Sequence, residues 1–126
     1  MAVVGNMNIL IVEDNAEMRR VIKSFIDDLA EELGECSDGA EALAAYTRQR
    51  PDWVLMDLKL KQVDGLTATR QIVAAFPEAK VMIVTAYADA ALRTAARQAG
   101  ACAYVLKDQL CDVRQILSGQ ADCDGN

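Results

Sequence analysis

Four of the short apolar runs in this chain end in residues whose types suit phosphoryl transfer. Glu13 and Asp14 follow the first run, Asp57 the third, Thr85 the fourth and Lys107 the fifth. The carboxyl ends of parallel strands meet at one edge of a sheet, so we expect these side chains to share a crevice. A lone Asp at a strand end is usually a turn residue, and a lone Thr or Lys there usually has no functional meaning. The joint placement at four strand ends is therefore what indicates a site.

The three carboxylates predict a divalent cation. Like charges that meet raise one another's pKa and destabilise a fold unless a cation is supplied. Mg2+ prefers oxygen ligands and is commonly held by one or two carboxylates with phosphate oxygens, whereas Ca2+ needs more ligands than this chain offers. An isolated pair such as Glu13-Asp14 would cap a helix in about three cases of four. The presence of Asp57 reverses that preference.

The chemistry that these residues could perform is attack of a carboxylate on phosphorus. Asp57 would form an acyl phosphate while Mg2+ and Lys107 neutralise the oxygens and the Thr85 hydroxyl donates a hydrogen bond. Phosphoryl transfer of this kind depends mainly on positioning and charge neutralisation. The chain has no histidine, which excludes Ser-His-Asp catalysis and a phosphohistidine of its own. The phosphodonor must then be another molecule.

An alternation of strands and helices would position these residues. Apolar strands followed by amphipathic helices call for a parallel sheet that is covered on both faces. We therefore expect an α/β fold, a flavodoxin-like (βα)5 three-layer sandwich. The strand order 2-1-3-4-5 is chosen partly by analogy with other doubly wound proteins. The expected strands cover residues 8–12, 33–37, 53–56, 80–84 and 102–106, and the expected helices lie near 18–29, 41–46, 66–76, 89–99 and 108–117.

Composition and charge favour one cytoplasmic domain. The 126 residues suit a single core, with a domain over 1–119 and a polar tail over 120–126. A net charge of -6 disfavours direct binding to nucleic acid or to an anionic membrane. Residues 1–7 do not read as a signal peptide, and no apolar run is long enough to span a membrane. The four cysteines form no C-x-x-C pair, which suits a reducing cytoplasm.

From about Asn8 to Leu117 the sequence resembles a response-regulator receiver domain. By that resemblance Asp57 is the phosphoacceptor, Asp14 and Asp57 bind the metal directly, and Glu13 acts mainly through water. The Lys59 carbonyl would complete the metal ligands, and Thr85 with Tyr104 would form the coupled switch pair. The matching fragments are Leu10 to Asp14, Met56 to Leu58, Asp64 to Leu66, Val84 to Ala86, Gly100-Ala101 and Tyr104 to Lys107.

The resemblance implies a signalling switch and not a turnover enzyme. A histidine kinase or a histidine phosphotransfer protein would phosphorylate Asp57, and the domain would assist its own phosphorylation and dephosphorylation. The surface that changes would be formed by the fourth helix, the fifth strand and the fifth helix, which could also form a homodimer. Without the resemblance, Tyr104 would be equally well explained as a half-buried aromatic. Trp53, Met56 and Phe25 are expected in the core.

Two residues depart from the family pattern. Lys61 stands where many receivers have proline after the phosphoacceptor, which predicts a less rigid loop. Asp108 replaces the proline that often follows the lysine. With residues 64–70, Lys107-Asp108 resembles the branch whose receivers precede a LuxR-type DNA-binding domain. The tail is too short for such a domain, so we expect either a stand-alone receiver or the front half of a transcription regulator.

Three other functions compete with the phosphoacceptor. A flavodoxin-like nucleotide binder would place Gly, Ser or Thr after the first strand, where this chain has Glu13-Asp14. A phosphatase of the aspartyl-phosphate type would have its nucleophile after the first strand, whereas Asp57 follows the third. A receiver-like interaction module without phosphorylation would explain Lys61 and Asp108 as drift. The presence of Asp57, Thr85 and Lys107 together argues against it.

Overall fold

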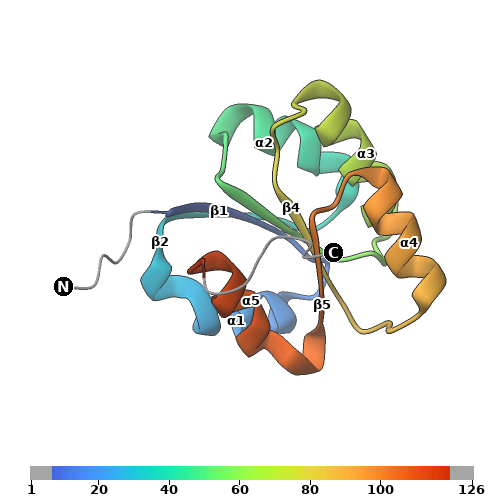
Figure 1. The fold of residues 1–126 in the computed structure, drawn as a ribbon. Helices are drawn as coiled ribbons and strands as arrows, with labels where there is room; N and C mark the ends of the chain where they lie inside the picture. Colours follow the sequence, from blue (N-terminus) through green and yellow to red (C-terminus); the bar gives the residue numbers. More distant parts are fainter. Residues whose placement is uncertain (1–6, 120–126) are drawn as a thin grey trace.

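The five parallel strands form one sheet in the order β2-β1-β3-β4-β5, as expected. A computed structural model describes residues 7–119, and Figure 1 shows the sheet with its helices. The predicted tail at 120–126 lies outside the described residues. The strands are β1 (Met7–Val12), β2 (Ala30–Cys36), β3 (Trp53–Met56), β4 (Val81–Thr85) and β5 (Ala103–Leu106).

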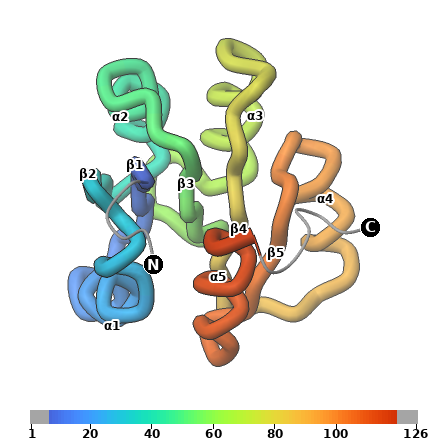
Figure 2. Tube along the Cα trace, turned by 60° about the vertical axis from the view of Figure 1, so that its left-hand side comes forward, coloured from blue at the N-terminus to red at the C-terminus, as the bar shows by residue number. Residues whose placement is uncertain are grey.

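Helices cover both faces of the sheet and complete the predicted three layers. Figures 1 and 2 show α1 and α5 on one face and α2, α3 and α4 on the other. No helix in the described part of the chain is both long and apolar enough to cross a membrane. The helices are α1 (Ala16–Ile26), α2 (Ala42–Gln49), α3 (Gly65–Ala75), α4 (Ala90–Ala99) and α5 (Leu110–Leu117), with 3-10 turns over Asp27–Leu29, Gly39–Glu41 and Lys107–Gln109.

Alternate strand residues supply two separate cores. Successive side chains of a strand point to opposite faces, so an apolar strand in a covered sheet packs against both helix layers. Leu10 and Val12 of β1 pack on the side of α2, α3 and α4. Ile9 and Ile11 pack against α1 and α5. The continuous apolar runs of β1, β3 and β4 follow from this double burial.

Side-chain caps fix the loops at the carboxyl edge of the sheet. Asn15 accepts a hydrogen bond from Met18 N at 2.8 Å and starts α1. Asp64 caps α3 through Thr67 N at 2.8 Å. A cap satisfies one of the amide groups that a helix start leaves without an intrahelical partner. The chain is thereby anchored a few residues beyond the acids that end β1 and β3.

The assignment of Phe25 to the core was wrong. Phe25 is 37% exposed on α1, and Val21 is 41% exposed. Ile22 and Ile26, four positions apart, carry the buried stripe of this helix. Because each helical residue turns about 100° from the one before it, Phe25 lies outside the stripe although it is apolar. Trp53 and Met56 are buried, as expected.

The second strand and its helix begin differently from the prediction. β2 starts at Ala30 and not at Leu33. Among the described strands it pairs only with β1, at the edge of the sheet. Its Glu31, Glu32 and Glu35 are not buried, so no apolar run marks its start. The spacing of Asp38 and Glu41, three positions apart, predicts a capping box for the second helix, but Asp38 instead caps a 3-10 turn through Ala40 N at 2.9 Å. α2 then begins at residue 42.

Candidate functional site

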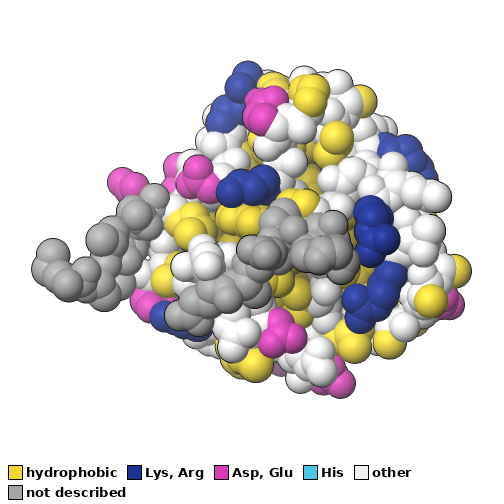
Figure 3. Space-filling model, in the orientation of Figure 1, with side chains coloured by type: hydrophobic (Ala, Val, Ile, Leu, Met, Phe, Trp, Pro, Cys, Tyr) yellow, Lys and Arg dark blue, Asp and Glu magenta, His cyan; other side chains and the backbone are white. Residues whose placement is uncertain are grey.

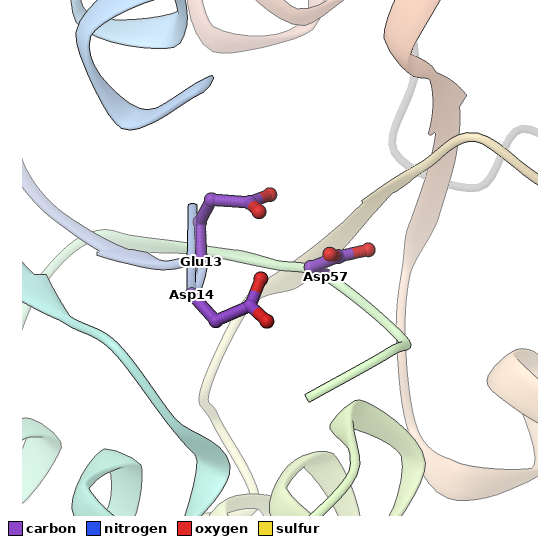
Figure 4. A group of neighbouring side chains, drawn as sticks. All are labelled: Glu13, Asp14 and Asp57. Atoms are coloured by element: carbon purple, nitrogen blue, oxygen red, sulfur yellow. The ribbon is translucent and has the colours of Figure 1, made fainter. Parts of the chain in front are cut away.

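Three carboxylates meet at the carboxyl edge of the sheet. Glu13, Asp14 and Asp57 each offer an oxygen, and these atoms all lie within 4.8 Å of one another (Figure 4). The pairing of β1 with β3 brings them together, since Asp57 N donates to Val12 O at 3.0 Å. Glu13 and Asp57 are 2% and 5% exposed. The structure therefore gathers the three acids that the sequence analysis selected.

Lys107 supplies a positive charge from the end of β5. Its Nζ lies 2.9 Å from Glu13 Oε1 and 3.1 Å from Asp57 Oδ2. The contact with Asp57 has the geometry of a hydrogen bond. The contact with Glu13 is an ion pair, and Oε1 accepts no aligned hydrogen bond from any residue in 7–119. One ammonium thus contacts the acids of two different strands.

Burial and charge shift the pKa of two of these groups upward. Burial raises the pKa of Glu13, and the negative charge of Asp57 adds to the rise, against a lowering by Lys107. Burial alone would lower the pKa of Lys107, but the contacts with Glu13 and Asp57 outweigh it. Lys107 therefore stays protonated at neutral pH. With the three acids ionised, the crevice carries two negative charges in excess.

The donor set of the crevice fits a hard divalent cation. All three acids offer oxygen, and one oxygen of Glu13 is buried with no aligned hydrogen-bond donor among the described residues. The excess negative charge matches a cation with two positive charges, and oxygen is the donor atom that Mg2+ prefers. Lys59 lies two positions after Asp57, and its Nζ is 5.2 Å from the centre of the Tyr87 ring. The role of the Lys59 carbonyl stays a prediction.

Thr85 and Tyr104 are joined through the backbone of Tyr87. Thr85 is fully buried at the end of β4, and its Oγ1 accepts from Tyr87 N at 3.4 Å. Tyr104 Oη donates to Tyr87 O at 2.7 Å. The Tyr104 ring also lies 4.6 Å from the Arg93 guanidinium of α4. Sequence reasoning missed Tyr87, because no motif marks a residue that acts through its backbone.

Two further residues fix the loops that carry the acids. Arg19 Nη1 donates to the Glu13 carbonyl at 2.6 Å, and its Nε contacts Glu35 at 3.0 Å. Asp38 accepts from three backbone amides of the loop after β3. An open depression of about 240 Å³ lies beside the acids and is lined by Asp14, Ser37, Asp38, Ala40, Glu41, Lys61 and Gln62. Sequence reasoning had assigned Asp38 only to a helix cap.

A doubly wound sheet with buried acids and a lysine at its carboxyl edge is the arrangement of a receiver-type signalling domain. The chain belongs to the response regulator receiver domain family, whose sequence model matches residues 9–118. It is 36% identical over 121 residues to the transcriptional regulatory protein YhcZ of Bacillus subtilis, covering 90% of this chain and 56% of that protein. It is 34% identical over 100 residues to the chemotaxis protein CheY of Thermotoga maritima, covering 79% of this chain and 83% of that protein.

Solved structures share the fold. A LuxR-family two-component response regulator of Aurantimonas sp. SI85-9A1 superposes with a TM-score of 0.80 at 29% identity, covering 94% of this chain and 87% of that one. A chain of the CheX-CheY-BeF3-Mg complex of Borrelia burgdorferi gives a TM-score of 0.81 at 20% identity, covering 92% and 90%. The present chain spans about half the length of regulators such as YhcZ and GacA.

Proposed function

We propose that this domain is a phosphoacceptor switch of a two-component system, phosphorylated on Asp57 with Mg2+. The observation that carries the proposal is the position of Lys107, which contacts Asp57 and Glu13 at the same crevice as Asp14. A nucleophilic carboxylate, oxygen ligands for a cation and a fixed ammonium are the parts that acyl phosphate formation requires. No turnover of a substrate is needed for this role.

The acids of β1 and β3 would hold the metal. Asp14 and Asp57 would bind Mg2+ directly, Glu13 would act mainly through water, and the Lys59 carbonyl would complete the set. When bound, Mg2+ neutralises charge on the phosphoryl oxygens. The buried position of Glu13 supports a fixed geometry for these ligands. Arg19 further restrains Glu13 by donating a hydrogen bond to its carbonyl.

The transfer itself would use three side chains of this domain. A carboxylate oxygen of Asp57 forms a bond to phosphorus while the bond from phosphorus to the donor nitrogen of a phosphohistidine breaks. The bonding electrons leave with the imidazole of the donor. Lys107 stabilises the negative oxygens, and the Thr85 hydroxyl donates a hydrogen bond to one of them. The contact of Lys107 Nζ with Asp57 Oδ2 at 3.1 Å supports this role.

The response to phosphorylation would pass through Tyr87. A phosphoryl group adds roughly -1.5 to -2 charges and three acceptor oxygens. A Thr85 hydroxyl that turns toward it weakens its contact with Tyr87 N and disturbs the carbonyl that Tyr104 binds. The surface of α4, β5 and α5, where Figure 3 shows basic side chains over α4, would change and could mediate a homodimer. A near-complete switch needs about 5.5 kcal/mol of differential stabilisation.

The partner would be a histidine kinase or a histidine phosphotransfer protein. Val21 and Phe25 are exposed on α1, the helix that begins two residues after Asp14, and would offer apolar side chains for docking of such a partner. Similarity to transcriptional regulators over about half their length supports a role as the receiver of such a regulator. We assign the receiver domain to residues 1–119 and place the protein in the cytoplasm. We expect this acidic segment not to bind nucleic acid directly.

Intact mass spectrometry with acetyl phosphate and Mg2+ tests the proposal. The protein should gain the mass of one phosphoryl group, and Asp57→Asn should gain none. Asp27→Asn, at an exposed position outside the crevice, serves as the control and should be phosphorylated normally. An unchanged mass of the natural sequence at saturating donor and metal would favour an interaction module that is not phosphorylated.

A further inference from the structure

The carboxylate of Asp38 is the main anchor of the loop that follows β3. Asp38 Oδ1 accepts from Lys61 N at 2.8 Å and from Gln62 N at 2.9 Å. Oδ2 accepts from Val63 N at 3.1 Å and from Ala40 N at 2.9 Å. Asp38 is only 8% exposed, although it belongs to a turn between β2 and α2. A single side chain thus binds three consecutive amides that lie more than twenty positions away.

Two glycines bring the backbones close at the ends of this loop. A Cβ at Gly39 would lie 2.2 Å from Val63 O, so only glycine permits the approach of the two turns. A Cβ at Gly65 would lie 2.0 Å from Asp57 O, and Gly65 N donates to Leu58 O at 2.9 Å. The loop is therefore tied to Asp38-Gly39 on one side and to the backbone after β3 on the other.

Lys61 gives Asp38 a backbone N–H donor that a receiver with proline at this position would lack. Proline has no backbone N–H and could not donate to Asp38. The sequence predicted a less rigid loop from this departure, whereas the structure adds a hydrogen bond from Lys61 N at 2.8 Å. A carboxylate that accepts several amide bonds forms charge-assisted contacts, which are stronger than neutral ones. The hydrogen bond thus offsets the missing ring.

We propose that Asp38 is a positioning residue for the metal site, which holds the loop of residues 58–64 in the geometry that Mg2+ requires. The inference rests on the proposed function, in which the Lys59 carbonyl of this loop is a ligand. Lys59 lies between the two tied ends, so its backbone can move only as far as the Asp38 and Gly65 contacts allow. Outer partners of this kind commonly affect metal affinity by about ten- to a hundredfold when they are removed.

A competing explanation is that the Asp38 charge alone attracts the cation. Asp38 and Glu41 line the same depression beside Asp14, so removing either charge lowers the local negative potential. The Glu41 carboxylate differs because, among the described residues, it accepts hydrogen bonds only from Ser37, at 3.4 Å, and from none of the loop amides. Glu41→Gln is therefore the matched control for the charge. Gly39→Ala is the complementary variant, because it displaces Val63 O without a change of charge.

The experiment measures Mg2+ affinity by titration and amide exchange by NMR. It compares the natural sequence with Asp38→Asn, Glu41→Gln and Gly39→Ala. Asp38→Asn retains one acceptor oxygen and should weaken Mg2+ binding by about tenfold. In the metal-free variant the amide protons of Lys61, Gln62 and Val63 should exchange faster. Gly39→Ala should also weaken binding and carries the test if Asp38→Asn fails to fold. Glu41→Gln should change the affinity and the amide exchange much less.

Each contrary result has a distinct meaning. Equal losses of affinity in Asp38→Asn and Glu41→Gln would assign the effect to charge and overturn the inference. Faster amide exchange in Asp38→Asn and Gly39→Ala without a change in Mg2+ affinity would leave Asp38 a structural role only, which also overturns it. If the natural sequence binds no Mg2+ at all, the proposed function itself fails, and the inference fails with it.

Discussion

Lys107 Nζ lies 3.1 Å from Asp57 Oδ2, although the two residues come from strands that are separated in the sheet by β4. The same ammonium is 2.9 Å from Glu13 Oε1. The lysine therefore bridges the acids that follow β1 and β3. Its removal would leave two buried carboxylates without their positive partner.

Replacing this lysine should make the fold depend on Mg2+. Lys107→Met keeps most of the chain length and removes the charge. We expect the free energy of unfolding of the metal-free protein to fall by about 1–3 kcal/mol, because buried charged groups lose a partner. Saturating Mg2+ should restore part of the loss. Urea unfolding with and without Mg2+ measures both effects, and an unchanged free energy in the absence of metal would contradict the prediction.

Replacing Asp14 should have the opposite effect on the free energy of unfolding of the metal-free protein. Its oxygen lies within 4.8 Å of those of Glu13 and Asp57, yet no ion pair joins Asp14 to a described lysine or arginine. Asp14→Asn removes this repulsion and should raise the free energy of unfolding by about 1 kcal/mol. Saturating Mg2+ should stabilise the natural sequence by about 2.7 kcal/mol at a hundredfold excess over Kd, and the variant less. Equal stabilisation of both proteins by Mg2+ would exclude Asp14 as a ligand.

The positions of the strands and the polar residues that end them could be predicted because both depend on local patterns, whereas the strand order 2-1-3-4-5 was chosen partly by analogy with other doubly wound proteins. Apolar runs such as the one before Asp57 mark buried strands, and the polar residue after each run then falls at one sheet edge. The contacts of Asp38 and Tyr87 could not be predicted in this way. They join side chains to backbone groups of distant loops, whose paths no residue pattern specifies. Phe25 was misplaced because apolar type alone does not define which face of α1 is buried.

Acid should remove the contribution of Asp38 to stability. Burial alone would raise the pKa of Asp38, but hydrogen bonds from amides including Gln62 and Val63 outweigh it and hold the pKa below its usual value. A carboxyl with a lowered folded pKa stabilises the fold above its unfolded pKa of about 3.9, and this stabilisation is lost as pH falls through the folded value. Asp38→Asn should therefore be less stable than the natural sequence near neutral pH, with a difference that shrinks in acid. Urea unfolding at several pH values measures it, and a difference that does not vary with pH would contradict this explanation.

The cysteines should differ sharply in reactivity. Burial raises the pKa of the Cys36 thiol to about 11, so almost no thiolate exists near neutral pH. Cys111 is exposed on α5. Iodoacetamide at about pH 8 should modify Cys111 in the folded protein and Cys36 only after unfolding. Peptide mass spectrometry identifies the modified residue, with a urea-unfolded sample as the control for labelling of Cys36. Rapid labelling of Cys36 under native conditions would mean that β2 opens at the sheet edge.

The link from Thr85 to Tyr104 should carry the phosphorylation signal through the backbone of a single residue, Tyr87. Tyr104→Phe keeps the ring beside Arg93 and removes only the hydroxyl that donates to Tyr87 O at 2.7 Å. Phosphorylation then has no Tyr104 hydrogen bond to break, so the accompanying chemical shift changes in α4 and β5 should be smaller than in the natural sequence. Amide NMR before and after addition of acetyl phosphate and Mg2+ measures them, with shifts around Asp57 as the internal control for phosphorylation. Equal changes in α4 and β5 of both proteins would show that the signal reaches this surface by a route that does not include the Tyr104 hydroxyl.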